Sequence, residues 1–263
     1  MKVTLITGAS SGIGEAFARR LAADKHDLVL VARNKKDLHE LCDELMLKHK
    51  IMAHYVVLDL AEPDADRKLL QETQQHGFEV DWLINNAGFG SAGDFAKLDV
   101  DRELQMIELN IAAVVAITHA FLGKMRERRS GTIINVSSAA GFQPVPFMAT
   151  YAATKAFVSS FSEAIAEENQ PYGIQVIALC PGSTKTDFFA ASKIERPIQV
   201  KGQQTAEDVV ETAMRAVKGG RTKVISGFAN KVGAMLGKFV PNFITRRVMA
   251  KVLRSRFQDE KFG

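Results

Sequence analysis

Short apolar runs alternate along the chain with longer segments whose apolar residues recur at helical spacing, and this alternation limits the possible folds most strongly. Apolar runs of strand length lie at 3–7, 27–31, 51–58, 82–85, 131–136, 174–179 and 223–226. Segments with helical spacing lie between them, among others at 13–24, 35–48, 102–128, 151–169 and 205–218. Strands that are apolar throughout, each followed by a crossover helix, form a parallel sheet with helices on both faces. The pattern therefore predicts an α/β, doubly wound fold with a seven-stranded parallel sheet.

The 263 residues suffice for one sizeable core, so we predict one Rossmann-type domain over 1–263, with its core at 1–227. The remaining segment, 228–263, is a basic tail interrupted at Pro241, and we predict one or two amphipathic helices there as a C-terminal helical extension. From Arg221 onward the chain has ten Lys or Arg and two Asp or Glu, so this part has a net charge of +8 and the remainder −4. We favour packing of the tail on its own domain or a second subunit, and we expect its apolar stripe to close part of the substrate pocket or a subunit contact while its charges face water. A membrane surface or an acidic acyl-carrier partner remains an alternative.

The start of the chain and its cysteines bear on the compartment. Residues 1–8 enter a strand and a glycine turn without a basic, long apolar or cleavable segment, so we expect no export. Cys42 and Cys180 are too few for a disulfide framework, and Cys180 ends an apolar run where a buried thiol is expected. No uninterrupted apolar run reaches the roughly 18 to 20 residues that span a bilayer. We therefore expect a cytoplasmic protein.

A glycine-rich turn, TGASSGIG, directly follows the first predicted strand and opens the first predicted helix. Glycines in such a turn let the backbone approach a pyrophosphate, and the helix N-terminus offers unpaired N–H groups and a partial positive charge. The alternative is an ordinary glycine-rich turn, because three residues separate the first two glycines where the common fingerprint has one. The strand-turn-helix context favours a dinucleotide site formed by Gly8, Ser10, Ser11, Gly12, Ile13 and Gly14.

The end of the second predicted strand bears on the choice of cofactor. An acid there would bond the ribose hydroxyls and repel a 2′-phosphate, but this chain has Arg33 followed by Asn34. Arg33 offers a planar fork to a phosphate, so we expect NADP (NADPH) in preference to NAD; a solvated surface arginine is the alternative. Asp59, followed by Leu60, either meets the adenine edge or begins an exposed turn.

Tyr151 and Lys155 are four residues apart in YAATK, so in a helix they share one face. Alone, this spacing equally suits a packed tyrosine beside a solvated lysine. Taken together, TGASSGIG, NNAG at 85–88, SSAAG at 137–141, YAATK and the Pro181-Gly182 pair resemble the short-chain dehydrogenase/reductase family in their order and spacing, over roughly residues 3–227.

The resemblance implies a role for each matching residue. Tyr151 would donate or accept the proton, and Lys155 would hold the nicotinamide ribose and lower the tyrosine pKa. Ser138, rather than Ser137, would hydrogen-bond the substrate oxygen, so Ser138 and Tyr151 would contact the substrate. Asn110 would hold a water in a proton relay to Lys155. Further contacts to the cofactor would come from Asn86, Ala87, Gly88, Tyr151, Lys155, Pro181, Gly182, Thr184 and Thr186.

The magnitudes agree with these roles. Lowering a tyrosine pKa by two to three units requires roughly 3 to 4 kcal/mol, about what one ammonium 4 to 5 Å away supplies at an effective dielectric constant near 20. The expected function is NADPH-dependent reduction of a ketone, aldehyde, steroid or 3-oxoacyl carbonyl, or the reverse oxidation. The alternative is a cofactor-binding regulatory or structural protein of the same fold. By analogy we expect a homodimer or homotetramer, and we expect no nucleic-acid partner.

Two further expectations concern the substrate and metals. Apolar residues after Ser138 and near 188 suggest an apolar substrate pocket, although aromatic residues are also common in cores: Phe142, Val145, Pro146, Phe147, Phe188 and Phe189. The segment between Thr186 and Thr205 would be the lid over it, as in the family. We expect no metal, because the histidines are scattered along the sequence, at His26, His39, His49, His54, His76 and His119.

Overall fold

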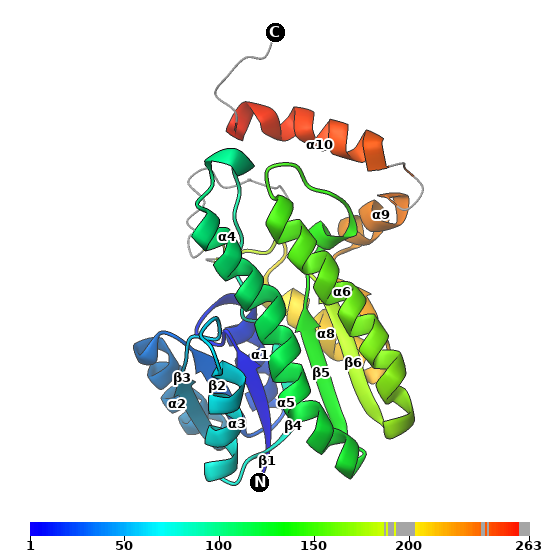
Figure 1. Ribbon diagram of the computed structural model, residues 1–263. Coiled ribbons are helices and arrows are strands. Elements are labelled where there is room, and N and C mark those ends of the chain that lie inside the picture. Colours follow the sequence, from blue (N-terminus) through cyan, green and yellow to red (C-terminus); the bar gives the residue numbers. More distant parts are fainter. Residues whose placement is uncertain (187, 189–191, 193–202, 238–239, 241, 258–263) are drawn as a thin grey trace.

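Seven parallel strands form one sheet at the centre of the protein (Figure 1). The computed structural model describes residues 1–186, 188, 192, 203–237, 240 and 242–257. The sheet has the order β3-β2-β1-β4-β5-β6-β7. Its strands are β1 (Lys2–Thr7), β2 (Leu28–Ala32), β3 (Ala53–Val57), β4 (Glu79–Asn85), β5 (Gly131–Val136), β6 (Ile174–Cys180) and β7 (Lys223–Ile225). The predicted fold class is confirmed.

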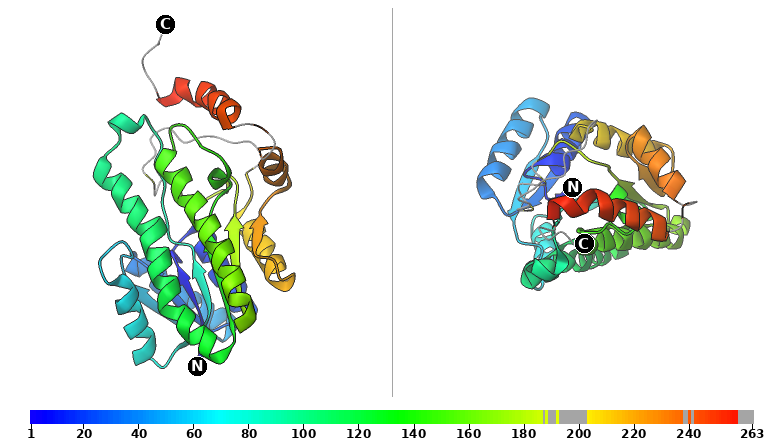
Figure 2. Two further views of the ribbon diagram at one scale, coloured as in Figure 1. Left: turned by 45° about the vertical axis from the view of Figure 1, so that its right-hand side comes forward. Right: turned by 90° about the horizontal axis from the view of Figure 1, so that it is seen from above.

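Helices cover both faces of this sheet, as its two-sided burial requires (Figures 1 and 2). One face is covered by α1 (Gly12–Ala23), α2 (Lys35–His49) and α8 (Ala206–Lys218). The other is covered by α3 (Ala65–Gln75), α5 (Ala113–Arg128) and α6 (Ala149–Asn169). Alternate strand residues divide between the two layers: Leu28 and Leu30 of β2 join the first, whereas Val29 and Val31 join the second.

Side-chain caps fix where several of these helices begin. The Asn34 side chain accepts hydrogen bonds from the backbone N–H groups of Lys36 and Asp37 at the start of α2. Thr205 and Asp208 form a reciprocal capping box at the start of α8. Such caps satisfy N–H groups that have no partner within the helix. The predicted helix starts lie within two residues of the observed ones.

A long helical stretch, Val100–Arg128, comprises α4 (Val100–Ile107), a π-helical turn (Glu108–Ala112) and α5. By length and composition alone this 29-residue stretch could cross a membrane, which differs from the expectation based on uninterrupted apolar runs. Its apolar residues are separated by polar ones. Ile117, Phe121 and Met125 of α5 are buried in the layer beneath the sheet, as in a core helix.

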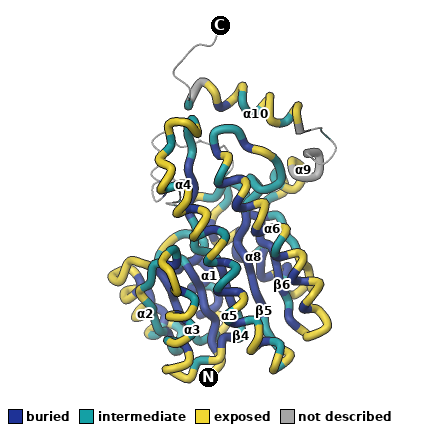
Figure 3. The backbone as a smooth tube through the Cα atoms, in the orientation of Figure 1, coloured by how far each residue is buried: buried dark blue, intermediate teal, exposed yellow. Residues whose placement is uncertain are grey.

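The C-terminal extension forms two helices, α9 (Phe228–Gly237) and α10 (Asn242–Phe257), with Pro241 between them. In Figures 1 and 2, α10 lies across the end of the molecule towards which the strands point. Figure 3 shows burial concentrated in the sheet, whereas most of α10 is exposed. Leu253 is the exception on this helix, with an exposed fraction of 3%. The extension therefore lies over the edge of the sheet at which ligands bind in this type of fold.

Candidate active site

From β1 the chain adds β2 and then β3 towards one edge of the sheet, and it then returns to add β4 on the other side of β1. The direction in which strands are added therefore reverses between β1 and β4. In doubly wound folds the ligand crevice lies at this reversal, outside the carboxyl ends of the strands. The loops after β1, β4, β5 and β6 all leave from that edge. They include most of the residues predicted to bind cofactor or substrate.

The glycine-rich turn after β1 has the backbone that its glycines permit. Gly8 and Gly12 have φ angles of +65° and +57°, a region that side chains with a Cβ seldom occupy. A Cβ on Gly14 would lie 2.1 Å from the carbonyl oxygen of Gly8, so α1 can approach the turn this closely only with glycine there. The Ile13 side chain packs against the layer formed by α1, α2 and α8, beside the turn.

The start of α1 fits a bound pyrophosphate. Ser11 occupies the N-cap position, but its side chain makes no capping hydrogen bond in the part of the chain that the structure describes. The backbone N–H groups in the first turn of α1 therefore have no capping side-chain oxygen of the kind that Asn34 provides for α2. Their partial positive charge favours an anion. Thr186 borders this turn, since a Cβ on Gly12 would lie 3.1 Å from its methyl group. Ser10 is half-buried in the same turn.

Arg33 and Asp59 meet at the ends of β2 and β3. The guanidinium Nη1 lies 3.5 Å from a carboxylate oxygen of Asp59, with side chains 68% and 30% exposed. Asp59 also accepts a hydrogen bond from the N–H of Ala61, as expected for an acid that begins a turn, and Leu60 is buried. Arg33 thus lies at the open edge of the predicted adenosine site. The amide oxygen of Asn34 is used to cap α2.

The loop after β4 is fixed by a threonine that the sequence reasoning did not include. The Thr7 hydroxyl accepts hydrogen bonds from the N–H groups of Asn86 (2.9 Å) and Ala87 (3.0 Å). The Asn86 amide in turn donates to the carbonyl oxygens of Thr7 (3.0 Å) and Gly8 (3.1 Å). The NNAG loop and the glycine-rich turn are therefore one hydrogen-bonded unit. Thr7 is the first residue of the TGASSGIG motif, but that pattern did not indicate its hydrogen bonds to the NNAG loop.

Asn110 is fully buried within the π-helical turn between α4 and α5. Its amide nitrogen donates to the Phe89 carbonyl (2.9 Å) and to the Thr154 hydroxyl (3.1 Å), and its oxygen accepts from the Phe89 N–H (3.2 Å). π-Helical turns often occur at functional sites. A Cβ on Gly88 would lie 2.8 Å from the Asn110 oxygen and 3.5 Å from Lys155 Nζ. Only a glycine at position 88 therefore allows the loop to approach Asn110 this closely.

The two candidate serines have different surroundings. Ser137 is buried, and its hydroxyl donates to the Lys155 carbonyl (2.6 Å) and contacts the Ser159 hydroxyl (2.8 Å). Ser138 is half-buried and caps the short 3₁₀ turn Ala139–Phe142. Burial raises the pKa of Tyr151, and the nearby Ser138 hydroxyl opposes this shift to a smaller extent. The serine that meets Tyr151 is thus the one the sequence selected.

Lys155 lies one turn after Tyr151 on α6 and is also buried. Its Nζ lies 6.0 Å from the centre of the Tyr151 ring and donates a hydrogen bond to the Val136 carbonyl (2.8 Å). Burial lowers the pKa of Lys155 to about 8, with Cys180 opposing the shift. Burying an ammonium is costly unless it gains further polar partners. Because an ammonium has three donors, Nζ can donate further hydrogen bonds, which suits the hydroxyl groups of a ribose.

Tyr151 belongs to an apolar cluster formed by four parts of the chain. Its buried members are Phe89, Met106, Val145, Met148, Tyr151, Ala152 and Leu253, with partly buried Phe147, Phe188, Met249 and Phe257 packed against them. The Tyr151 and Phe188 rings lie 5.5 Å apart. Val145, Phe147 and Phe188 thus lie where the sequence suggested an apolar pocket. Phe142 does not, because its ring lies under Lys223 near β7, and Phe189 lies outside the described residues.

The extension contributes directly to this cluster. Phe257 of α10 stacks on Phe147 at 5.6 Å, and Leu253 and Met249 lie on the same side of the helix. Phe147 has a φ of +65°, an unfavourable conformation for a residue with a Cβ, and such strained positions occur often at functional sites. The sequence indicated that the tail is amphipathic. It also led to the prediction that the apolar stripe of the tail closes part of the substrate pocket or a subunit contact, and the packing of Leu253 in the cluster with Tyr151 agrees with the first of these.

The loop after β6 contains the last group of predicted cofactor residues. Pro181 is buried and accepts a hydrogen bond from the Ala139 N–H, and Thr184 donates to the Gly182 carbonyl. A Cβ on Gly182 would lie 1.9 Å from the Asn230 amide nitrogen, so α9 packs directly on this loop. Asn230 was not among the predicted residues. Most of the predicted lid lies outside the described residues.

Two of the histidines that are scattered along the sequence lie side by side in the structure. His54 of β3 and His76 at the end of α3 are far apart in the sequence, but their rings lie 4.4 Å apart and both contact Glu72. The crossover from β3 to α3 brings them together, which spacing along the chain did not indicate. The three residues lie on the far side of the protein from Tyr151, near the amino ends of the strands.

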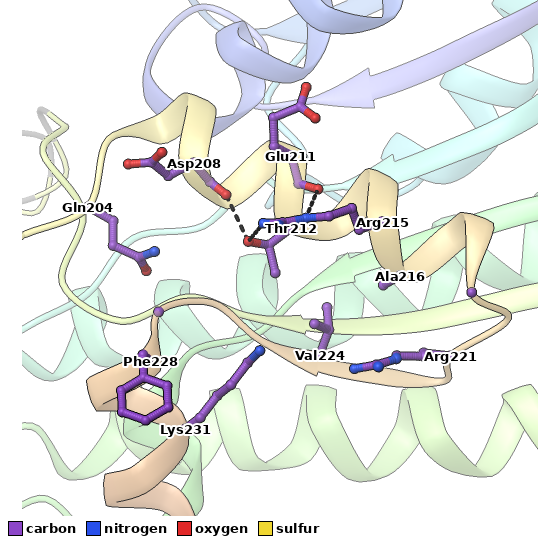
Figure 4. Close-up of a pocket in the computed structure, with 12 residues that line it drawn as sticks. Gln204, Asp208, Glu211, Thr212, Arg215, Ala216, Arg221, Val224, Phe228 and Lys231 are labelled. Atoms are coloured by element: carbon purple, nitrogen blue, oxygen red, sulfur yellow. Dashed lines mark hydrogen bonds between the residues drawn. The ribbon is translucent and has the colours of Figure 1, made fainter.

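The described residues also line a hollow of about 490 Å³ between α8, β7 and α9 (Figure 4). Its charged side chains belong to Asp208, Glu211, Arg215, Arg221 and Lys231. Several are used locally: Arg215 donates to the Glu211 carbonyl and to the Thr212 hydroxyl. None of the residues predicted to be catalytic borders this hollow, so we place the candidate active site at the cluster around Tyr151.

Comparison with known proteins places this geometry in a family. The family described as short chain dehydrogenase matches residues 2–197. The very-long-chain 3-oxoacyl-CoA reductase of Mus musculus is 30% identical over 264 residues, which cover 98% of this chain and 82% of that protein. A short-chain dehydrogenase from Sphingobium yanoikuyae, solved in complex with NADPH, superposes with a TM-score of 0.82 at 28% identity, covering 100% of this chain and 99% of that one.

A second solved structure is similar over its full length. The bulky-bulky ketone specific alcohol dehydrogenase from Comamonas testosteroni superposes with a TM-score of 0.77 at 26% identity, covering 100% of this chain and 97% of that one. These relatives and the Tyr151 site agree on the class of reaction. The chain therefore belongs to the short-chain dehydrogenase/reductase family and is an oxidoreductase that acts on a CH–OH or C=O group.

Proposed function

We propose that the protein reduces the carbonyl group of a bulky, apolar substrate with NADPH, or catalyses the reverse oxidation, with Tyr151 as the proton donor or acceptor. The observation that supports this most directly is that the Ser138 hydroxyl lies close enough to Tyr151 to lower its pKa, within an apolar cluster. Two neighbouring hydroxyl groups can both bond one carbonyl oxygen. Their apolar surroundings strengthen these bonds by excluding water.

The bound nicotinamide would supply the hydride; the side chains handle the proton and the charge. Ser138 and Tyr151 would stabilise negative charge that develops on the carbonyl oxygen, and Tyr151 would release its proton to that oxygen. The buried Lys155, in its protonated form, would stabilise the resulting Tyr151 phenolate. Asn110 fixes the backbone of Phe89 and so the loop that borders Lys155.

The preference for NADPH is supported by Arg33 at the end of β2, where an acid would favour NAD. The Arg33 side chain is 68% exposed, and its ionic partner among the described residues, Asp59, lies at the long distance of 3.5 Å. A 2′-phosphate would form shorter, bidentate hydrogen bonds with the guanidinium. The relative from Sphingobium yanoikuyae was solved with NADPH, in agreement with this proposal.

The proposed substrate class follows from the side chains around Tyr151. The described cluster is aromatic and aliphatic, and α10 covers it with Met249, Leu253 and Phe257. A substrate with a large apolar group next to its carbonyl would bury that group against these side chains. Two relatives act, by their names, on long acyl thioesters and on bulky ketones. A long-chain 3-oxoacyl group and a bulky ketone are thus the first two substrate classes to test.

The outer side of α10 supports a second proposal. Ile244, Val248 and Val252 follow one another at four-residue spacing and are exposed, as are the neighbouring Arg247 and Lys251. Only part of the apolar surface of the described tail residues is therefore buried within this chain. We propose that the exposed part contacts a second subunit or an anionic membrane surface. A homodimer or homotetramer in the cytoplasm stays our expectation.

The test is a carbonyl panel that contains short and long 3-oxoacyl thioesters, small and bulky ketones, aldehydes and steroids, each assayed with NADPH and NADH. We expect saturable NADPH oxidation with bulky apolar carbonyls, and kcat/KM that rises with the size of the apolar group. If the protein binds NADPH tightly but oxidises it with no member of the panel, it is a cofactor-binding regulatory or structural protein of this fold.

A further inference from the structure

Three potential metal ligands meet on the surface of the protein, at the opposite end of the strands from Tyr151. His54 lies on the edge strand β3, Glu72 lies on α3, and His76 follows the last turn of that helix. Glu72 and His76 are four residues apart and so lie on one side of the helix. The crossover that joins β3 to α3 brings His54 to the same place. Nothing in the proposed carbonyl chemistry uses these residues.

The distances between the ligand atoms suit a small divalent ion. A Glu72 carboxylate oxygen lies 3.2 Å from Nε2 of His54 and 3.2 Å from Nε2 of His76. Two ligands at about 2.0 to 2.1 Å from a tetrahedral zinc ion lie about 3.4 Å from each other. One ligand atom from each of the three residues lies within 4.8 Å of the other two. Small side-chain rotations would therefore bring all three atoms to coordination distance.

The chemistry of the three groups indicates which ions they would bind. Two imidazole nitrogens and one carboxylate oxygen form a donor set that zinc and neighbouring first-row transition metals prefer, whereas calcium and magnesium prefer oxygen ligands alone. The side chains of His54, Glu72 and His76 are 27%, 35% and 44% exposed. The position is open enough for an ion to enter and for water to complete its coordination.

Neighbouring aromatic rings limit the motion of both histidines. The Phe78 ring stacks on His76 at 5.3 Å and meets His54 edge-on at 5.6 Å, and Tyr55 lies beside His54 at 6.4 Å. Both histidines contact the same carboxylate oxygen of Glu72, whereas an ordinary ion pair needs only one histidine. Partial restriction of both rings lowers the entropy lost when a metal fixes them.

We propose that His54, Glu72 and His76 form a binding site for one divalent transition-metal ion, best matched by zinc, which links α3 to the edge strand β3. Because the ion would bind the folded chain, it would stabilise the protein without taking part in the carbonyl reaction. The site differs from the proposed active site in its residues, its elements and its end of the sheet.

The experiment is a titration of the full chain, produced without a histidine tag and treated with a chelator, with zinc chloride and separately with cobalt chloride. We expect saturable binding of one ion per chain, a rise in melting temperature with zinc, and the visible absorption of tetrahedral cobalt. Carbonyl reduction should be equal with and without zinc, so failure of the proposed function would leave this test intact.

Variants locate the ion. His76→Ala and His54→Ala should each weaken zinc binding by at least about tenfold, and Glu72→Gln, which keeps the size of the side chain, should do the same. The control is His39→Ala, because His39 forms an exposed pair with Asp43 at the same four-residue spacing on α2 but has no third ligand among the described residues. It should leave zinc binding unchanged.

Two outcomes would overturn the proposal. The first is an absence of saturable binding to the intact chain, which would leave the cluster as a hydrogen-bonded contact between α3 and β3. The second is binding that His76→Ala, shown to be folded by circular dichroism, leaves unchanged, which would place the ion elsewhere on the chain.

Discussion

The ammonium nitrogen of Lys155 lies 6.0 Å from the centre of the Tyr151 ring, and both side chains are buried on successive turns of α6. Burial raises the pKa of Tyr151 and lowers the pKa of Lys155 to about 8. From the sequence, the tyrosine pKa was expected to fall through the attraction between an ammonium and a phenolate alone. The structure adds desolvation, which opposes both charges, so Lys155 can lower the tyrosine pKa only while it keeps its own proton.

The lowered pKa of Lys155 predicts how stability changes with pH. Between about pH 8 and pH 10.5 the unfolded chain binds the Lys155 proton more tightly than the folded chain, so the free energy of unfolding should rise with pH across this window. Lys155→Met removes this effect. The free energy of unfolding of the wild type minus that of the variant should therefore rise by roughly 3 kcal/mol from pH 7.5 to pH 10.5, as measured by urea unfolding.

The control for this prediction is Lys36→Met, which removes an ammonium whose side chain is 80% exposed. Its difference from the wild type should change much less with pH. A difference between the wild type and Lys155→Met that stays constant from pH 7.5 to pH 10.5 would show that Lys155 is not desolvated in the folded protein.

Ser138 and Ser137 provide a matched pair for testing which hydroxyl meets the substrate. Ser138→Ala removes the hydroxyl close to Tyr151, and kcat should fall by about 100-fold or more while the fold is kept. Ser137→Ala removes bonds to the Lys155 backbone and to Ser159, and should lower the free energy of unfolding by about 1 to 3 kcal/mol. Equal loss of kcat in both variants would argue against the proposed substrate contact.

Arg33→Ala tests the cofactor preference. Removing the guanidinium should raise the dissociation constant for NADPH by about tenfold or more and leave that for NADH nearly unchanged, because only NADPH has the 2′-phosphate. Arg67→Ala, at a side chain that is 80% exposed on α3, is the control and should affect neither cofactor. Tighter binding of NADH than NADPH by the wild type would contradict the assignment.

Two adjacent residues of α10 separate its inner side from its outer side. Leu253 is 3% exposed within the cluster around Tyr151, whereas Val252 is 64% exposed. Leu253→Ala should lower stability by about 2 kcal/mol and lower kcat/KM for bulky apolar substrates. Val252→Ala should leave both unchanged but weaken dimerisation or binding to anionic vesicles at low salt. If Val252→Ala lowered stability and kcat/KM while Leu253→Ala left both unchanged, the side of α10 with Val252 would be the one that packs near Tyr151.

The strands could be predicted from sequence because they are buried on both faces. In β2, for example, all five residues are buried, so the apolar run itself identifies the strand. The helix α3 was not identified, because its buried residues are only Ala65, Leu69 and Thr73 on an otherwise polar segment. Such a helix is held mainly by its neighbours, and its own pattern is weak.

The same limit applies to the site. The motifs identified Tyr151, Lys155, Ser138 and Asn110, since each lies in a short segment with a recognisable pattern. The contacts of Asn110 depend on a π-helical turn, and Leu253 approaches Tyr151 from the far end of the chain. Contacts of this kind, like that between His54 and His76, arise from packing of distant segments and leave no local pattern.

The most direct test of the account is the effect of Tyr151→Phe on single-turnover reduction of the best carbonyl substrate by bound NADPH. The change removes one hydroxyl and keeps the ring, so the variant should fold, bind NADPH as tightly as the wild type, and react at least about 100-fold more slowly. A rate within about tenfold of the wild type would mean that less than roughly 1.4 kcal/mol of transition-state stabilisation was lost, and Tyr151 would then not be the proton donor.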